Sequence, residues 1–380
     1  MGGSKTIRAV RLVSGLILMA FVVCHLANLA IGMRSLAEME AWRATLTVPW
    51  TTGAGQWLLA VAGTIHLSLG LYAVASRRSL TLSATDLAQL TLGLLTPPLL
   101  IAHVIALATA NRVSPGFADN YGQILAVYWS FAPAYAFLQL FVVVVVWLHG
   151  AIGLYSWLVL QPIWRRIGGF VLPVLFALPI LALLGFASAG QEVLDRLAGD
   201  PAWRQMILDN VGKIAKVTRE LAGLQSGLLQ AYGLLVLLAF AIFGARVLRA
   251  RLRPVEIAYD GGLQAQGRYG LSVLEISLLN DVPHAHVCSG RGRCGTCRVR
   301  IDAGAQALSP AGDLERGTLE RVGAAPGERL ACQARVLGAG IAVTRLLPAF
   351  ADATAAQAPR EWTAGAAAVA PAAASAKEPA

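Results

Sequence analysis

Residues 286–299 read His-Val-Cys-Ser-Gly-Arg-Gly-Arg-Cys-Gly-Thr-Cys-Arg-Val. This stretch holds three of the chain's five cysteines, and 34 residues separate the third of them from a fourth. The four are Cys288, Cys294, Cys297 and Cys332. Thiolates are soft, charge-neutralising donors that bind ferric iron well. Three thiolates from one loop and one from a distant segment can surround a binuclear iron–sulfur cluster.

Two other uses of clustered cysteines compete with iron. Structural zinc sites often have four cysteines, but they usually pair two Cys-x2-Cys knuckles, and this chain has one. A disulfide framework is disfavoured because thiols stay reduced on the cytoplasmic side, to which this segment is assigned below. Gly290, Gly292 and Gly295 favour the cluster, since glycine lets the backbone wrap closely around inorganic sulfide. We therefore predict a [2Fe–2S] cluster, with zinc as the alternative.

Two further segments flank the cysteine loop, Gly270-Leu-Ser-Val-Leu-Glu275 and Arg329-Leu-Ala-Cys-Gln333. Together with the loop they resemble a [2Fe–2S] ferredoxin domain of the β-grasp type. The resemblance implies that the four cysteines of the motif are the cluster ligands. Plant-type ferredoxins have four residues between the first two cysteines, and this chain has five, so it is closer to the adrenodoxin-like branch. His284 and His286 are expected to be polar groups of the loop, not ligands.

The polar character of this region begins at Pro254. Alternating side chains predict strands at 256–259, 297–301 and 335–337, and a short helix is predicted at 273–279. Residues 254–348 thus form a small α+β domain, which the resemblance identifies as the ferredoxin domain. Residues 351–380 are rich in alanine and proline and have no apolar periodicity, so they are expected to be a linker or tail.

The first two thirds of the chain are strongly apolar. Of the 380 residues, 56% are hydrophobic and only 14% are charged, against about 25% charged in a typical soluble domain. This composition excludes a soluble enzyme, a disordered chain and a nucleic-acid binder, despite the net charge of +10. Six apolar stretches are long enough to cross about 30 Å of hydrocarbon. They are residues 12–32, 55–76, 88–110, 133–158, 170–190 and 221–246.

Lysine and arginine residues gather on one side of these six helices, before the first and after the sixth among other places. By the positive-inside rule, the N-terminus and the ferredoxin domain are cytoplasmic, in a multi-pass protein of the inner (cytoplasmic) membrane. The expected fold class is multi-domain, with an all-α six-helix transmembrane bundle over residues 1–250 followed by the small α+β domain. The loop 191–220 is expected to form short amphipathic helices over the outer face, one of them starting at Asp200-Pro201.

Each of the first four apolar helices carries one histidine: His25, His66, His103 and His149. Ionisable side chains in hydrocarbon are costly and usually mark function. At 1.5 Å per residue, the first and third of them lie about 20 Å from the cytoplasmic face, and the second and fourth about 10–15 Å from it. We therefore predict two b-type haems. His25 with His103 would hold one in the outer half, and His66 with His149 the other in the inner half.

Bis-histidine ligation leaves no open iron position, which favours electron transfer over oxygen chemistry. The constellation resembles the dihaem cytochrome b anchors of succinate:quinone oxidoreductases, in which four helices carry one histidine each. This resemblance covers about residues 7–160 and implies a quinone as a further ligand in the membrane. The fifth and sixth helices carry no histidine and are expected to be scaffold.

A further resemblance covers the whole chain. The segment Arg11-Leu-Val-Ser-Gly-Leu-Ile-Leu-Met-Ala-Phe-Val-Val-Cys-His25, six helices and a ferredoxin domain are similar to the N-terminal half of bacterial class III adenylate cyclases. In those proteins a catalytic domain follows the ferredoxin, whereas the residues after Pro348 are too few to form one. We expect the chain to be either a fragment that ends in an interdomain linker or a relative without the catalytic part.

Three functions remain open from the sequence. The first is a redox sensor that reads the quinone pool and regulates an adenylate-cyclase-type output domain; this is the function we favour. The second is a transmembrane quinol/quinone oxidoreductase that passes electrons to a cytoplasmic acceptor through the ferredoxin domain. The third is a membrane anchor with structural cofactors. Expected partners are the lipid bilayer, a quinone, a cyclase output domain or a protein electron partner, and a second copy of the chain.

Overall fold

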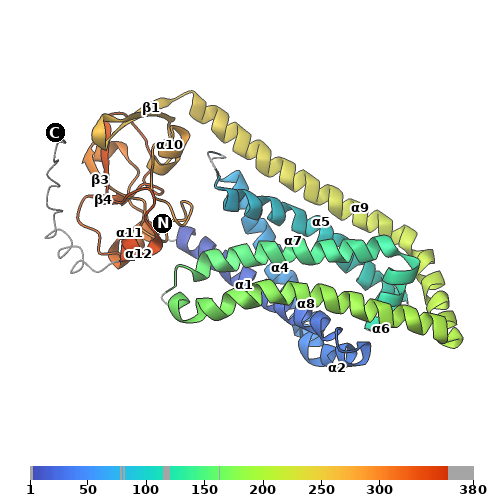
Figure 1. Ribbon diagram of the computed structural model, residues 1–380. Helices are drawn as coiled ribbons and strands as arrows, with labels where there is room; N and C mark the ends of the chain where they lie inside the picture. Colours follow the sequence, from blue (N-terminus) through green and yellow to red (C-terminus); the bar gives the residue numbers. More distant parts are fainter. Residues whose placement is uncertain (1–2, 78, 80–81, 114–119, 162, 358–380) are drawn as a thin grey trace, which may run out of the picture. The chain divides into compact units, whose positions relative to one another are not determined.

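The computed structural model describes residues 3–77, 79, 82–113, 120–161 and 163–357. The chain forms two compact units (Figure 1). The helical unit consists of Thr6–Ser76 and Ser83–Phe243. The C-terminal unit consists mainly of Gly244–Ala380, with Met1–Lys5 and Arg77–Leu82. The division separates the apolar part of the sequence from the polar part.

Among the described residues, six helices are long and apolar enough to cross a membrane, which confirms the predicted number. They are α1 (Gly3–Ile31), α4 (Gly53–Ala75), α5 (Ala84–Val113), α7 (Pro133–Leu158), α8 (Trp164–Gly199) and α9 (Pro201–Arg251). Large aromatic side chains stand on their outer surfaces. Trp57, Phe137, Phe170 and Phe176 are 71–75% exposed within the unit. Exposed apolar surface of this extent is typical of a surface that contacts another protein or a membrane.

Short helices connect the long ones, and carboxylates tie them together. They are α2 (Leu36–Leu46), α3 (Val48–Thr51), α6 (Tyr121–Ala126) and the π-helix η1 (Val127–Phe131). Glu192 of α8 accepts the Leu36 N–H at 2.7 Å, at the first turn of α2. Glu40 of α2 accepts the Tyr121 N–H at 2.8 Å, at the first turn of α6. Both bonds satisfy N–H groups that a helix start leaves free.

Two glycines bring α1 and α8 into backbone contact. A side chain at Gly185 would overlap the Leu29 carbonyl oxygen, and one at Gly32 would crowd the Gly185 carbonyl. Small residues at a crossing are typical of helices that pack within membranes. Around this crossing lies a buried core formed by α1, α2, α6, α7, α8 and the start of α9, with Met39, Ile207 and Val193 fully buried.

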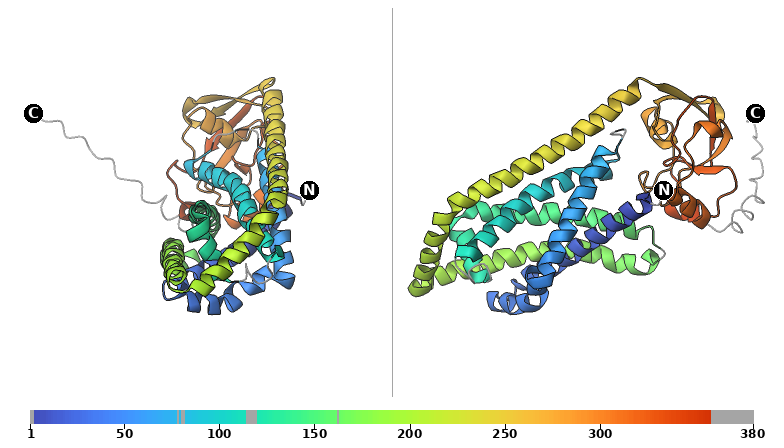
Figure 2. Two further views of the ribbon diagram at one scale, coloured as in Figure 1. Left: turned by 90° about the vertical axis from the view of Figure 1, so that its right-hand side faces the viewer. Right: turned by 180° about the vertical axis from the view of Figure 1, so that it is seen from behind.

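The predicted short helices over 191–220 are wrong. α8 continues to Gly199, and α9 then runs from Pro201 to Arg251 without interruption (Figure 2). The break itself lies where the sequence predicts it, since the Asp200 carboxylate accepts the Trp203 N–H at 2.9 Å. Pro201 occupies the first helical position, where its missing N–H costs nothing. After it α9 contains no further proline, so nothing in the sequence ends the helix before Arg251.

The C-terminal unit is a small mixed α/β domain. Its five strands are β1 (Pro254–Tyr259), β2 (Gln264–Arg268), β3 (Arg298–Ala303), β4 (Glu328–Leu330) and β5 (Ile341–Arg345). They form one sheet in the order β2-β1-β5-β3-β4, in which only β1 and β5 pair in parallel. The helices are α10 (Val273–Leu279), α11 (Asp313–Arg321), α12 (Ala353–Gln357) and the 3-10 turns η2 (Asp260–Gly262) and η3 (Ala305–Ala307). A capping box between Ser272 and Glu275 starts α10.

Most of the predicted elements of this domain are confirmed. The strand at 256–259, the helix at 273–279 and the strand at 297–301 match β1, α10 and β3. The strand at 335–337 is wrong, because Arg335 and Val336 form only isolated bridges, to Ser272 and Leu308. In the expected tail, residues 353–357 form α12. Residues 358–380 lie outside the described residues.

Candidate functional site

The four cysteines of the motif lie in the interior of the C-terminal unit. Their exposed fractions are 5% for Cys288, 0% for Cys294, 1% for Cys297 and 7% for Cys332. The first three lie on the loop between α10 and β3, and Cys332 follows β4. Because β3 and β4 are paired antiparallel, the Cys297 and Cys332 ends of these strands come together. The sheet thus joins the distant cysteine to the loop.

Left-handed backbone conformations fold the loop. Gly290, Gly292 and Gly295 have φ of 77°, 64° and 78°, values that favour glycine. Space is also restricted, since a Cβ at Gly295 would lie 2.9 Å from Val322. Outside the loop, the Thr318 hydroxyl of α11 donates to the Gly292 carbonyl at 2.7 Å. These contacts hold the loop around its sulfurs.

Hydrogen bonds converge on the sulfurs. Backbone N–H groups of Arg293 and Thr296 donate to Cys288 Sγ and Cys294 Sγ, each at 3.5 Å. The Gln333 amide donates to Cys332 Sγ at 3.3 Å and to the Gly290 carbonyl at 3.1 Å. Donors of this kind stabilise negative charge on sulfur, and around a cluster they tune its reduction potential. No residue pattern in the sequence predicts this contact of Gln333 with the sulfur.

The sulfurs are arranged in two pairs. A hydrogen bond from the Cys294 thiol, with help from backbone N–H groups, lowers the pKa of Cys288 to about 5. The hydrogen bond between Cys297 and Cys332 raises the pKa of the Cys297 thiol. In the part of the chain that the structure describes, no three His, Cys, Asp or Glu side chains converge on a point that could hold one metal ion. In a [2Fe–2S] cluster held by four cysteines, each iron takes two thiolates, and two pairs of cysteines are compatible with that arrangement.

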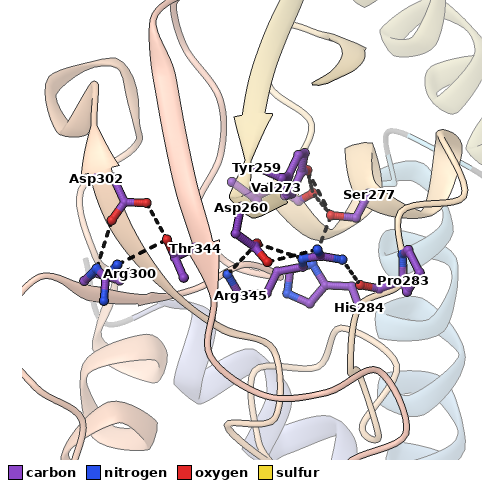
Figure 3. A network of polar contacts seen from close by, with 10 residues as sticks. All are labelled: Tyr259, Asp260, Val273, Ser277, Pro283, His284, Arg300, Asp302, Thr344 and Arg345. Atoms are coloured by element: carbon purple, nitrogen blue, oxygen red, sulfur yellow. Dashed lines mark hydrogen bonds and ion pairs between the residues drawn. The ribbon is translucent and has the colours of Figure 1, made fainter. Parts of the chain in front are cut away.

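His284 belongs to a network of polar contacts with Ser277 and Tyr259 (Figure 3), and Nδ1 of His286 lies 2.7 Å from the His284 carbonyl. His284 is 4% exposed, and its Nδ1 shares a hydrogen bond of 3.0 Å with the Ser277 hydroxyl, which bonds to Tyr259 at 2.9 Å. Burial lowers the pKa of His284 to about 4, so this ring is neutral at pH 7. Beside it, Arg345 holds both carboxylate oxygens of Asp260 at 2.9 and 3.0 Å. This network joins β1, α10 and β5.

In the helical unit, the four helix histidines lie in two pairs. The ring centres of His25 and His103 are 6.5 Å apart, with planes inclined by 57°. Those of His66 and His149 are 6.2 Å apart, with planes inclined by 83°. Two imidazoles bound to opposite sides of one metal ion have ring centres about 6.4 Å apart, since the metal–nitrogen bond is about 2.1 Å and the nitrogen lies about 1.1 Å from its ring centre. Both ring separations are thus compatible with two imidazoles that bind one metal ion from opposite sides.

His66 and His149 are held in matching ways. Nδ1 of His66 lies 3.2 Å from the Arg11 carbonyl of α1, with the Ser14 hydroxyl at 3.3 Å. Nδ1 of His149 lies 3.2 Å from the Gln89 carbonyl of α5. A carbonyl can only accept, so Nδ1 carries the proton in both rings, and Nε2 keeps the lone pair that binds a metal.

His25 and His103 have other surroundings. The His25 ring stacks on Phe21 at 5.6 Å. The Gln139 side chain lies beside His103. Within the described residues, the buried Nδ1 atoms of both histidines have no hydrogen-bond partner. The two pairs thus share their spacing but differ in what fixes the rings.

Comparisons with known proteins concern the C-terminal unit. Residues 261–337 match the family model described as a 2Fe-2S iron-sulfur cluster binding domain. The chain is 34% identical over 94 residues to "2Fe-2S ferredoxin-5" of Aquifex aeolicus, which is 24% of this chain and 98% of that protein. It is 32% identical over 76 residues to the "2Fe-2S ferredoxin" of Pseudomonas aeruginosa, which is 20% of this chain and 68% of that protein.

"Chlorosome protein I" of Chlorobaculum tepidum is 33% identical over 76 residues, covering 31% of that protein. No solved structure matches the chain. The family model includes the loop of Cys288, Cys294 and Cys297 and also Cys332. The cysteine motif, the paired sulfurs and the family match therefore all indicate a [2Fe–2S] cluster in the C-terminal unit.

Proposed function

Because the chain belongs to the [2Fe–2S] ferredoxin family through its C-terminal domain, we propose that it is a membrane-bound redox protein that joins this electron-transfer domain to two b-type haems. The observation that supports the haems best is the pairing of four histidines from α1, α4, α5 and α7 at ring separations of 6.5 and 6.2 Å. Each helix contributes one imidazole, and the four imidazoles in two pairs are the number that bis-histidine ligation of two haems requires.

The residues present fit the group. His25 with His103 would hold one haem and His66 with His149 the other, and each haem would supply a one-electron carrier. Nδ1 of His66 and of His149 donates to a main-chain carbonyl, as metal-binding histidines usually do. In the C-terminal domain, Cys288, Cys294, Cys297 and Cys332 would hold the cluster.

A membrane location is part of the proposal. Six apolar helices and outward aromatic side chains support it. The distribution of lysine and arginine supports a cytoplasmic ferredoxin domain in an inner membrane. Electrons would then move between the haem level of the membrane and a cluster in the cytoplasm.

The wider proposal concerns the biological role of this electron transfer. We favour a sensor that reads the quinone pool and controls an adenylate-cyclase-type output domain, because the sequence resembles the N-terminal half of such cyclases along its whole length. A quinol/quinone oxidoreductase with a soluble acceptor is the second candidate, favoured by the electron-transfer domain itself. Steady turnover with a quinol and a soluble acceptor would favour the oxidoreductase. Cyclic-AMP output that follows the redox state, with an output domain attached, would favour the sensor.

The first experiment is a spectrum and a metal analysis of the full chain purified in detergent. We expect two haems b and two further non-haem irons per chain, with a sharp α-band on reduction. Replacing His25 or His103 by alanine should remove one haem, and replacing His66 or His149 the other, while the cluster stays. Cys294→Ser should remove the cluster and leave both haems. A preparation with zinc in place of iron, or without porphyrin, would contradict the proposal.

A further inference from the structure

Two glycines lie against the inner histidine pair, each on the helix that faces the ring. A Cβ at Gly15 of α1 would lie 2.9 Å from Cε1 and 3.2 Å from Nδ1 of His66. One at Gly93 of α5 would lie 2.8 Å from Cε1 and 3.2 Å from Nδ1 of His149. Real Cβ atoms do not approach ring atoms this closely, so each ring occupies the space that the missing side chain leaves.

Each glycine is also one turn from the carbonyl that its histidine uses. The acceptor for His66 is the carbonyl of Arg11, four residues before Gly15. The acceptor for His149 is that of Gln89, four residues before Gly93. In a helix this carbonyl also accepts the N–H of the residue four positions later, here the glycine itself. A second donor reaches it only where no side chain stands in the way.

The same spacing between a glycine and a histidine occurs on α1 and on α5. Gly15 precedes His25 by ten residues, and Gly93 precedes His103 by ten. Ten helical residues rise about 15 Å. α1 and α5 each therefore carry a glycine at one histidine level and a ligand candidate at the other.

We propose that Gly15 and Gly93 are positioning residues for the inner haem: they admit the rings of His66 and His149 to the carbonyls of Arg11 and Gln89, which fixes Nδ1–H and turns Nε2 to the iron. This inference rests on the proposed haem binding. It assigns a role to two glycines, and it applies to one histidine pair only. The His25–His103 pair has no such carbonyl among the described residues.

A carbonyl acceptor on Nδ1–H makes the imidazole a stronger donor to the metal. Stronger donation favours ferric over ferrous iron, so the bond lowers the reduction potential of that haem. The test replaces each glycine by alanine in the full chain and follows haem content and midpoint potentials by spectroelectrochemistry. Alanine has a higher helix propensity than glycine, so a loss of haem in these variants cannot come from a weakened helix.

For Gly15→Ala and Gly93→Ala we expect the inner haem to titrate at a higher potential or to be lost, while the outer haem keeps its wild-type potential. The controls are Gly169→Ala on α8 and Gly233→Ala on α9, two helices without a histidine, where a Cβ would meet no atom within 4 Å. These should keep both haems and both potentials. Gly93→Ala is then repeated in a His103→Ala background, in which only the inner haem is expected to remain. A shift in potential seen in this background belongs to the inner haem.

Three results would overturn the inference. One is a pair of glycine variants with two haems and unchanged potentials. Another is an equal effect of the control substitutions, which would mean that any change in the bundle disturbs the haems. The third is a change confined to the outer haem. A wild-type protein without haem is a different result, because it refutes the proposed function itself.

Discussion

The ion pair between Glu315 and Arg329 gives the sharpest prediction for the ferredoxin domain. Glu315 of α11 has a side chain only 2% exposed, and that of Arg329 in β4 is 15% exposed. The guanidinium donates to both carboxylate oxygens at 2.7 and 2.9 Å, and the Leu330 N–H donates at 2.9 Å. Since Leu330 lies two residues before Cys332, this carboxylate fixes the strand that presents the fourth sulfur.

Glu315→Ala leaves a largely buried guanidinium without its anion. Breaking such a pair from one side costs about 3–5 kcal/mol of unfolding free energy. Unfolding in guanidinium chloride has an m-value of about 3 kcal/mol per M for a domain of this size. The denaturant concentration at which half of the cluster's visible absorption is lost should therefore fall by about 1 M or more.

Glu315→Gln keeps an acceptor for the Leu330 N–H but loses the charge, so its shift should be smaller. The control is Glu320→Ala, on the exposed face of the same helix, which should change the free energy by less than about 0.5 kcal/mol. If Glu315→Ala unfolds at the same denaturant concentration as this control, the carboxylate does not anchor β4 and the reasoning fails.

Three further predictions concern other contacts. Gly295→Ala forces a Cβ onto a left-handed residue 2.9 Å from Val322, so we expect about 1–3 kcal/mol of destabilisation and faster cluster loss, measured by absorbance; an unchanged rate would contradict this. The Arg345 guanidinium lowers the pKa of Asp260, so the ion pair stabilises the fold above the unfolded pKa and is lost as pH falls through the folded one. The difference in unfolding free energy between wild type and Asp260→Asn should therefore stay constant above about pH 5 and shrink as pH falls below the ordinary value of 3.8, and a difference that does not change with pH would exclude the pair as cause. Gly185→Ala places a Cβ on a carbonyl of α1, so the thermal midpoint of the detergent-solubilised chain should fall by several degrees, whereas Gly169→Ala, in open space on the same helix, should not lower it.

Much of the C-terminal domain could be predicted because its signals are local. The spacing of the cysteines and the glycines between them depend on a few consecutive residues. β4 and β5 escaped prediction because three residues in β4 and a mixed pattern in β5 carry little periodicity. The buried role of His284 also escaped, because its partners Ser277 and Tyr259 lie on other elements.

In the helical unit, hydropathy predicted the number of long helices, since crossing hydrocarbon requires a length of apolar sequence that can be counted. It did not predict that the helix beginning at Pro201 continues unbroken to Arg251, because the polar half of that helix has the composition of a loop. Helical rise alone suggested which histidines share a level, and the structure places those pairs at 6.5 and 6.2 Å.

The sequence by itself determined the candidate ligand residues, the cysteine motif and the apolar helices, because each is a property of residues close together in the chain. Only the tertiary structure decided that Gly15 and Gly93 face histidine rings and that main-chain carbonyls accept the Nδ1 protons of these rings. It also decided that the other histidine pair lacks such acceptors among the described residues. The physical reason is that these contacts join separate helices. Their rotation and crossing are set by packing over the whole bundle, which no local pattern encodes.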